Sequence, residues 1–291
     1  MTAPRRAEGE PETNLERLER SLLLDFGRCC KDFGLIGHRD RVMACLSGGK
    51  DSFTMLHLLR RMQRRTPFVF DVFAVTVDLG QPAFDPEPIE EFARAQGVEL
   101  RIVEQEVFSV MREKVPQGKS LCSFCARIRR GVLYRIAKET GATKIALGHH
   151  REDVVETLML NLLYSGQTKA MPPRLVSDDG EHVVIRPMAY LAEDDIERFA
   201  AARGMRTSTC QGCGKDDPHR RKIKLLLQEL SAENPKVKGN LLAALSTVLP
   251  SHLLDRELLA SLGRPVPSVQ KGRTRHSYEE EAEGSTPNEV L

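Results

Sequence analysis

The chain has 291 residues, a formal net charge of +2 and 41% hydrophobic residues, which is typical of a globular protein with one large domain or one domain plus extensions. No apolar run approaches the ~20 residues that a membrane span requires, and the polar segment 1–13 does not resemble a secretory signal. We therefore expect a cytoplasmic protein with no membrane partner.

Strand-like and helix-like segments alternate along most of the chain. The predicted order is helix 15–33, strand 42–46, helix 52–65, strand 69–77, helix 87–96, strand 99–104, helix 124–140, strand 144–147, helix 152–164, strand 183–186 and helix 192–204. This alternation predicts an α/β fold with a doubly wound parallel sheet over 14–217, preceded by an N-terminal helix. Helical periodicity continues as a C-terminal extension over 218–262, whereas 1–13 and 263–291 have the composition of disordered segments.

A glycine-rich turn follows the first predicted strand and precedes a predicted helix. It consists of Ser47, Gly48, Gly49, Lys50, Asp51 and Ser52. Glycines let backbone N–H groups approach an anion, and the helix directs its positive end toward the same place. Lys50 adds a full charge, and the hydroxyls of Ser47 and Ser52 can donate hydrogen bonds. An ordinary surface turn is the alternative, but the strand–turn–helix context favours a phosphate-binding loop.

Further polar residues follow other predicted strands. Asp78 follows strand 69–77, while Gly148, His149 and His150 follow strand 144–147. Because ligands of such sheets lie beyond the carboxyl ends of the strands, we expect these residues to adjoin the phosphate loop and to contact a nucleotide. His149 and His150 have an alternative role as surface residues of the turn. Asp153 could contact the ligand or only cap the next helix. Asp51 could orient a metal ion or the loop, or could only be a carboxylate that the dipole stabilises at the start of the helix.

The sequence has seven cysteines, an odd number that argues against a disulfide framework. Cys29, Cys30 and Cys45 lie in apolar stretches and are predicted to be small buried residues. The other four form the pairs Cys122-x-x-Cys125 and Cys210-x-x-Cys213. Four thiolates could close a zinc site, the commonest outcome, or could act as redox dithiols or as catalytic cysteines on an open cluster. Spacing alone does not separate these alternatives.

Basic residues follow each cysteine pair. They are Arg127, Arg129, Arg130 and Arg135 after the first, and His219, Arg220, Arg221, Lys222 and Lys224 after the second. Such clusters can hold a polyanion through phosphate contacts, but they are equally compatible with solvated helix faces. Local charge therefore leaves nucleic-acid binding open.

Taken together, the motifs resemble one known family. They are the loop 47–52, Cys122-x-x-Cys125, Gly148-His149-His150-Arg151-Glu152-Asp153, the stretch 161–166, Met171-Pro172-Pro173-Arg174-Leu175, and Cys210-x-x-Cys213-Gly214. The combination is similar to the tRNA 2-thiocytidine synthetases, the tRNA-cytidine 32 2-sulfurtransferases of the PP-loop ATP pyrophosphatase superfamily. The resemblance runs from about residue 15 to about residue 249.

The resemblance implies ATP as co-substrate on the loop 47–52, with Mg2+ neutralising phosphate charge. It implies a 4Fe-4S cluster held by Cys122, Cys125 and Cys213 only, so that one iron stays open to carry a hydrosulfide. Cys210 matches the motif but is not an expected ligand. Lys50 and Asp51, together with the three cluster cysteines, are the residues for which the resemblance implies a catalytic role.

The activity implied is ATP-dependent 2-thiolation of cytidine 32 in the tRNA anticodon loop, by adenylation of the C2 oxygen and then sulfur transfer. The implied partners are tRNA, ATP and a cysteine desulfurase as sulfur donor, with a homodimer as one option. Three alternatives remain: a 2-thiouridine synthetase, an adenylate-forming amidating ligase, and a zinc-stabilised RNA-binding module without turnover. The thiouridine enzymes typically add an N-terminal zinc finger, whereas this chain has no cysteine before Cys29.

Overall fold

The computed structural model describes residues 13–80, 84–105, 121–207 and 217–263, with side chains from residue 127 onward in the third range. The chain divides into two compact units, residues 1–246 and 247–291. The second unit holds the short helices η1 (Pro250–His252) and α10 (Arg256–Ser261). The first unit holds the sheet and every site residue that the structure describes.

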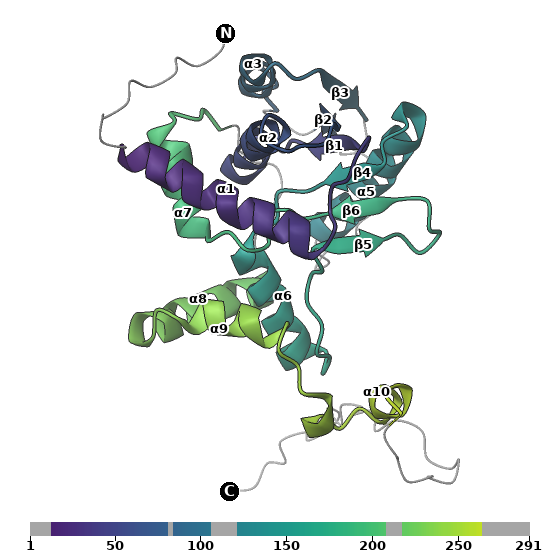
Figure 1. Ribbon diagram of the computed structural model, residues 1–291, viewed down its shortest axis with the longest axis vertical. Helices are drawn as coiled ribbons and strands as arrows, with labels where there is room; N and C mark the ends of the chain where they lie inside the picture. The colour runs from purple at the N-terminus through teal and green to yellow at the C-terminus, as the bar shows by residue number, and fades with distance from the viewer. Residues whose placement is uncertain (1–12, 81–83, 106–120, 208–216, 264–291) are drawn as a thin grey trace, which may run out of the picture. The chain divides into compact units, whose positions relative to one another are not determined.

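A six-stranded sheet with the order β3-β2-β1-β4-β6-β5 forms the centre of the first unit (Figure 1). Its strands are β1 (Arg41–Cys45), β2 (Asp71–Asp78), β3 (Leu100–Glu104), β4 (Lys144–Ala146), β5 (Arg174–Val176) and β6 (Val183–Ile185). The first four strands and β6 pair in parallel, with Ala44 of β1 opposite Ala74 on one side and Ala146 on the other. The predicted α/β class with a doubly wound, mainly parallel sheet is thus confirmed.

The edge strand β5 differs from the sequence expectation, which contained no strand there. It pairs antiparallel with β6, so that Leu175 lies opposite Val184. The chain reverses near Gly180, whose φ of +73° suits glycine, and the N–H of Ser177 donates to the carbonyl of His182 at 2.9 Å. Three exposed residues are too few to show the two-residue period of a strand, which explains the omission.

The predicted helices are present, with ends that shift by a few residues. They are α1 (Asn14–Asp32), α2 (Lys50–Gln63), α3 (Glu87–Gln96), α5 (Leu121–Thr140), α6 (Arg151–Tyr164) and α7 (Glu193–Ala202), followed by α8 (Pro218–Glu233) and α9 (Val237–Ala244). Thr13 and Glu16 form a capping box at the start of α1, where the N–H of Glu16 donates to the Thr13 hydroxyl at 3.2 Å.

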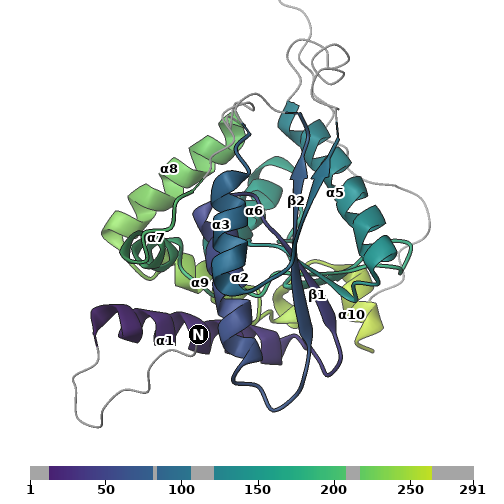
Figure 2. The ribbon, with the colours of Figure 1, turned by 90° about the horizontal axis from the view of Figure 1, so that it is seen from above.

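Helices cover both faces of the sheet (Figure 2). Side chains of a strand alternate between the two faces, so Val42 and Ala44 pack into one core and Met43 into another. The first core includes residues of α1, α2, α3 and α7, and we call this side the α2 face. The second core includes Val132 and Ile136 of α5, and we call this side the α5 face.

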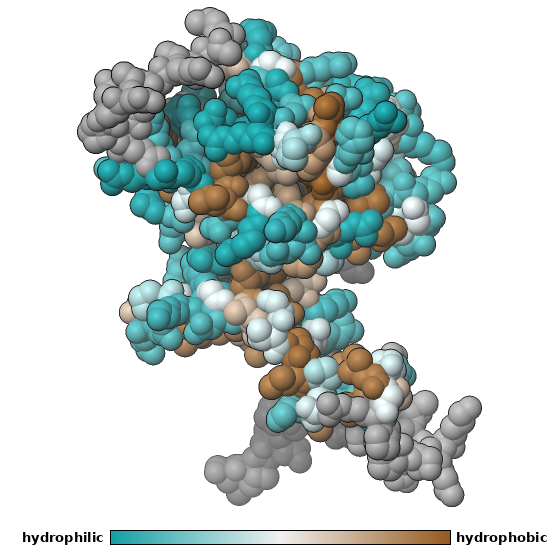
Figure 3. All heavy atoms as spheres, in the orientation of Figure 1, coloured by the Kyte–Doolittle hydropathy of each residue, from teal (hydrophilic) through white to brown (hydrophobic). Residues whose placement is uncertain are grey.

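Helices α8 and α9 pack on α6 rather than on the sheet. Val155 of α6 and Ile223 and Leu227 of α8 form a small buried cluster of their own. Along the sheet-bearing unit, hydrophilic residues predominate on the face that Figure 3 presents, and apolar residues show in smaller patches between them. Because α8 packs on α6, the basic residues of α8 are attached to the sheet through the helix that follows β4.

Candidate active site

The site lies where the strand order reverses. From β1 the chain proceeds through α2 to β2 on one side, whereas β4 and β6 continue the sheet on the other side of β1. In doubly wound sheets, the crevice between two such strands at their carboxyl ends is the usual ligand site. The two segments that meet at this point are residues 46–52 after β1 and residues 147–153 after β4.

The loop after β1 is closed by its own hydroxyl groups. The Ser52 hydroxyl donates to the carbonyl of Gly49 at 2.9 Å, and the N–H of Ser47 donates to the Ser52 oxygen at 3.2 Å. Gly48 has a φ of +79°, a conformation that side chains disfavour. Helix α2 then begins at Lys50 with Gly49 as its N-cap, a residue without a side chain to cap the first turn. The N–H groups of that turn are thus suited to an anion.

Gly148 brings the loop after β4 against this first turn. A Cβ atom at position 148 would lie 3.1 Å from the carbonyl carbon of Asp51 and from the nitrogen of Ser52. Because these neighbours are backbone atoms, a side chain would force the phosphate loop to move. The glycine therefore allows the close approach of the two loops, and it places the next residue, His149, beside the phosphate loop.

The ammonium group of Lys50 contacts three carboxylates. Its Nζ atom lies 3.1 Å from Asp51, 3.2 Å from Glu193 and 3.6 Å from Glu197. Burial lowers the pKa of Lys50, but the charges of Asp51 and Glu193 outweigh it and leave the pKa above its usual value. Lys50 is consequently a fixed cation at the start of α2, and in this structure it is directed toward α7.

Two other expected site residues lie at the same edge of the sheet. Asp78 ends β2, and its carboxylate accepts a hydrogen bond from the N–H of Gly80 at 2.9 Å. Asp153 accepts from the backbone N–H of His150 at 3.0 Å and thereby caps α6. Of the two roles considered for Asp153, the structure thus provides the cap. Its carboxylate is also 4.0 Å from Arg220 of α8.

Glu152 was not among the expected site residues, whereas His150 was expected to contact a nucleotide; both side chains are buried. The Glu152 carboxylate accepts from the N–H of Glu193 at 2.8 Å and from Arg151 at 2.7 Å, and it lies 3.3 Å from the His150 ring. Burial alone would raise the pKa of Glu152, but the hydrogen bonds from His150 and Arg151 lower it to about 2. Glu152 thus ties the start of α6 to the start of α7. The only signal for Glu152 in the sequence was its position as an acidic residue close to the histidines of the motif.

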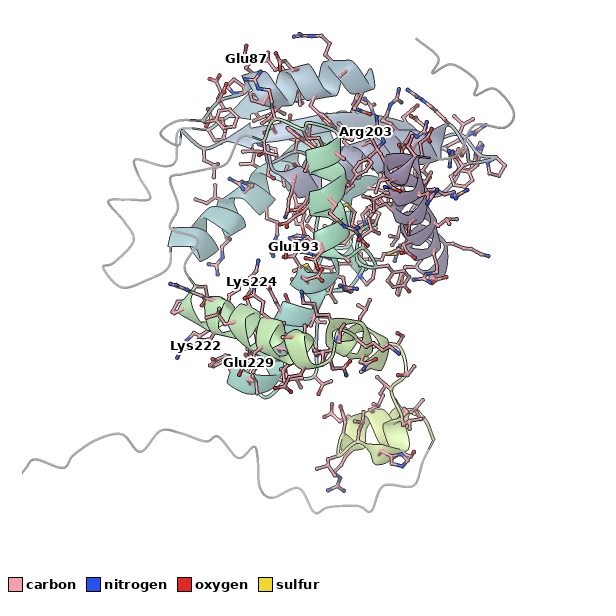
Figure 4. The ribbon with its side chains drawn as sticks, turned by 90° about the vertical axis from the view of Figure 1, so that its left-hand side faces the viewer. Glu87, Glu193, Arg203, Lys222, Lys224 and Glu229 are labelled. Carbon is pink, nitrogen blue, oxygen red and sulfur yellow. The ribbon has the colours of Figure 1, made fainter. Side chains whose placement is uncertain are left out.

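A cavity of about 160 Å³ lies beside Lys50 but does not suit phosphate. Five carboxylates line it, with Lys224 and Lys238 as the basic members; the acidic residues are Glu152, Glu156, Glu193, Asp194 and Glu197. Figure 4 shows Glu193 and Lys224 extending toward each other from α7 and α8, at a separation of 3.5 Å. Because its lining is mainly acidic, this cavity would repel a triphosphate.

The cysteines can be placed only in part. Cys122 and Cys125 lie in the first turns of α5, three residues apart, which puts both positions on one side of the helix. Their side chains, and the residues Cys210 and Cys213, lie outside the described part of the chain. Arg129 lies on the same stripe one turn further. Burial raises the pKa of the Cys45 thiol at the end of β1, and the charge of Arg129 partly opposes that rise. The cysteine-bearing end of α5 therefore points to the carboxyl edge of the sheet, and its thiols suit a soft metal or a cluster.

The fold and the loop define a class of protein. Residues 23–211 match the family described as a PP-loop domain. The structure is also similar to that of a solved protein, the U34-tRNA thiolase NcsA from Methanococcus maripaludis with its 4Fe-4S cluster. The TM-score is 0.63 and the identity 20%, over 86% of this chain and 89% of that chain. At that identity, the likeness shows the fold.

Two curated relatives are much closer in sequence. The tRNA-cytidine(32) 2-sulfurtransferase of Anaeromyxobacter sp. (strain K) is 53% identical over 245 residues, 84% of each chain. The protein of the same name from Tolumonas auensis is 48% identical over 246 residues, 84% of this chain and 82% of the relative. The chain belongs to the tRNA-cytidine(32) 2-sulfurtransferase family, a family of tRNA-modifying enzymes, which confirms the resemblance seen in the motifs. None of the helices in the described ranges is long and apolar enough to cross a membrane.

Proposed function

We propose that this enzyme replaces the C2 oxygen of cytidine 32 in tRNA with sulfur, at the expense of ATP, which is split into AMP and pyrophosphate. The observation that carries the proposal is the phosphate loop 47–52 at the switch point of the sheet, in a chain with 53% identity to a named relative over 84% of its length. Both observations are needed, because the loop supports the binding of ATP and the similarity to the relatives supports the choice of tRNA cytidine as substrate.

The first step activates a poor leaving group. The C2 oxygen of cytosine attacks the α-phosphorus of ATP, the bond from that phosphorus to the bridging oxygen breaks, and pyrophosphate leaves. Charge grows on the phosphate oxygens in this step, and we assign its stabilisation to the N–H groups at the start of α2, which have no side-chain cap. We assign Mg2+ to the same phosphates, where it neutralises charge in related phosphoryl chemistry. Lys50 and Asp51 contribute at the entrance to α2, the former as a fixed cation.

The second step exchanges oxygen for sulfur. A hydrosulfide attacks C2, the C2–O bond breaks, AMP leaves with the oxygen, and the proton of the hydrosulfide passes to solvent. No electrons are transferred, so this step needs no oxidant or reductant. We assign a 4Fe-4S cluster to Cys122, Cys125 and Cys213, because thiolates are its preferred ligands and the first two share one side of α5. Held by three thiolates, such a cluster would leave one iron free to bind the sulfur that is transferred.

The tRNA backbone would be held by basic residues around this edge. Arg130 and Arg135 of α5 are exposed, as are Arg221 and Lys222 of α8. A base in the anticodon loop is partly unpaired. Bringing it out of its stack therefore costs about a few kcal/mol or less. We further infer a cysteine desulfurase as sulfur donor, a cytoplasmic location and, as an option for assembly, a homodimer.

The decisive experiment is mass analysis of tRNA nucleosides from a strain that lacks the gene, before and after complementation. Loss and recovery of 2-thiocytidine supports the proposal, whereas loss of 2-thiouridine identifies the enzyme as a uridine thiolase. Unchanged levels of both thionucleosides would show that the protein does not thiolate tRNA.

Anaerobic purification tests the metal centre. Iron, labile sulfide and broad visible absorption are expected; a colourless protein with one zinc ion would instead indicate a zinc-stabilised module. Cys213→Ala should abolish 2-thiocytidine formation, whereas the matched variant Cys210→Ala should retain most of it. Equal loss in both variants would show that the assignment of the three ligands is wrong.

A further inference from the structure

Helix α6 ends on an exposed aromatic side chain that meets a second ring on α8. Tyr164 is the last residue of α6 and is 49% exposed. Its ring centroid lies 4.3 Å from that of His219, which is also exposed, and the two ring planes are tilted by 54°. Leu162 and Leu163, which precede Tyr164, are exposed as well, so the end of α6 offers more than one isolated apolar residue to a partner.

The main chain after α6 holds Tyr164 in a fixed place. The N–H groups of Ser165 and Gln167 both donate to the carbonyl of Asn161, at 3.1 and 3.0 Å. The side-chain amide of Asn161 donates to the carbonyl of Lys169 at 3.0 Å and so closes the turn that follows the helix. A ring that is fixed before binding loses little conformational freedom when a ligand packs on it.

The start of α8 fixes the second ring in the same way. Asp217 caps α8, and its carboxylate accepts from the N–H of His219 at 3.0 Å. The next residue, Arg220, is paired with Glu156 of α6 at 3.1 Å, which fastens the first turn of α8 to α6. The aromatic pair Tyr164–His219 is therefore built from two helices that are joined to each other.

Unpaired cations surround the aromatic pair. Arg221 and Lys222 follow His219 on α8, Lys169 lies in the turn after α6, and all three are exposed. None of the three forms an ion pair with a carboxylate within the described ranges. Figure 4 shows Lys222 and Lys224 extending from opposite sides of α8, so that Lys222 is directed away from Glu193. Exposed aromatic rings between unpaired cations are typical of surfaces that bind single-stranded nucleic acid.

The aromatic pair also lies at the end of the sheet to which the reaction is assigned. Figure 2 shows α8 beginning at the same end of the sheet as α5, the helix that carries Cys122 and Cys125 in its first turns. Strand β2 ends there too. An RNA loop that presents a base to this edge of the sheet therefore has the aromatic pair beside it.

We propose that Tyr164 and His219 form a stacking platform for an unpaired base of the tRNA anticodon loop, a base other than the cytidine that is modified. The inference rests on the proposed function, because it names a further contact with the same RNA substrate. A base that leaves its neighbours in the loop loses their stacking, and an aromatic side chain replaces it. The platform thus favours the open form of the loop, whereas phosphate contacts do not distinguish a loop from a duplex.

The test measures the affinity of the full-length, anaerobically purified protein for an anticodon stem–loop RNA with cytidine 32, at several salt concentrations. Tyr164→Ala should raise the dissociation constant ~10-fold, the effect of one lost stacked base. Tyr164→Phe keeps the ring and should stay within ~2-fold of the wild type. The dependence of log affinity on log salt should be unchanged in Tyr164→Ala, whereas Lys222→Gln should reduce its slope by ~0.7 through loss of one phosphate contact.

Two controls distinguish a stacked base from other contacts. Leu163→Ala removes the exposed apolar neighbour of Tyr164 and should bind the stem–loop as the wild type does. A fully paired RNA duplex should bind to Tyr164→Ala and to the wild type equally, because its bases are not free to stack on a side chain. Wild-type affinity of Tyr164→Ala for the stem–loop would overturn the proposal. Equal losses in Tyr164→Ala and Leu163→Ala would also overturn it, since they would indicate an apolar docking surface for another protein.

The fluorescence of 2-aminopurine, which stacking quenches, locates the base. The analogue replaces each unpaired base of the loop in turn, except cytidine 32. One position should be quenched on binding to the wild type and less quenched on binding to Tyr164→Ala. If no position distinguishes the two proteins, no base stacks on Tyr164 and the platform is refuted.

The outcome is independent of the nucleoside analysis. If 2-thiocytidine depends on the protein but Tyr164→Ala binds the stem–loop normally, the platform is refuted and the activity stands. If Tyr164→Ala loses affinity for the stem–loop alone but no 2-thiocytidine depends on the protein, the platform stands and the assigned reaction is refuted.

Discussion

The two faces of the sheet hold buried charge in different ways. On the α2 face, the carboxylate of Glu19 is 6% exposed and is surrounded by His57 at 3.2 Å and by the guanidinium groups of Arg61 and Arg203. On the α5 face, Arg129 and Arg186 form no ion pair with a carboxylate within the described ranges, and the Nε atom of each is buried without a hydrogen-bond partner there, as is that of Arg61 on the α2 face. Paired charge fixes α1, α2 and α7 to one another, whereas unpaired charge is what a ligand site requires.

The largest effect is expected from breaking the paired cluster. Glu19→Gln leaves Arg61 and Arg203 without their shared counter-charge, and we expect it to lower the free energy of unfolding by ~3 kcal/mol. Urea denaturation measures this loss. The control is Glu181→Gln, which removes an exposed ion pair with Lys138 and should change stability by less than ~1 kcal/mol. Similar effects of the two variants would show that the Glu19 cluster is no more important than a surface pair.

A second variant tests the contact between the two loops of the site. Gly148→Ala places a methyl group 3.1 Å from the backbone of Asp51 and Ser52 and must displace the phosphate loop. We expect ATP-dependent thiolation to fall ~10- to 100-fold, because small misplacements of a catalytic loop have effects of that size. The control Gly131→Ala, in α5 with no atom within 4 Å, should retain activity. Full activity in Gly148→Ala would mean that the loop tolerates the shift.

Acid should weaken the paired face. Although burial raises the pKa of Glu19, the hydrogen bond from His57 and the charges of both arginines lower it from 4.5 to about 2. A group with a depressed pKa stabilises the fold fully above pH 4.5 and loses that contribution as the pH falls toward 2. Urea midpoints measured between pH 6 and pH 3 should therefore fall in the wild type and fall less in Glu19→Gln. Parallel curves for the two proteins would contradict the shift.

The smallest effect on stability is expected on the unpaired face. In the absence of ligand, Arg129→Gln should leave the free energy of unfolding within ~0.5 kcal/mol of the wild type or raise it, because the side chain it replaces has an unpartnered buried nitrogen. Urea denaturation of the two proteins makes the comparison. A destabilisation as large as that of Glu19→Gln would place Arg129 in the scaffold.

Much of this protein was evident from the sequence. The alternation of strands and helices predicted the doubly wound sheet, since each period reflects which side of an element is buried. The segment from Ser47 to Ser52 predicted a phosphate loop, because two glycines between a strand and a helix let backbone N–H groups approach an anion at the start of the helix. The same reading brought Asp78 and Gly148 to one edge of the sheet, since parallel strands end there together.

Only the tertiary structure could decide what surrounds those motifs. Lys50 was expected to face phosphate, but three carboxylates, two of them about 140 residues away on α7, hold its ammonium group in this structure. Gly148 followed a strand in the sequence, yet its need to be glycine comes from its approach to Asp51 and Ser52. Arg129 was one member of a basic run, and burial separates it from the exposed Arg135. Local patterns report which side of an element is apolar, whereas the partner of a buried charge depends on segments that only folding brings together.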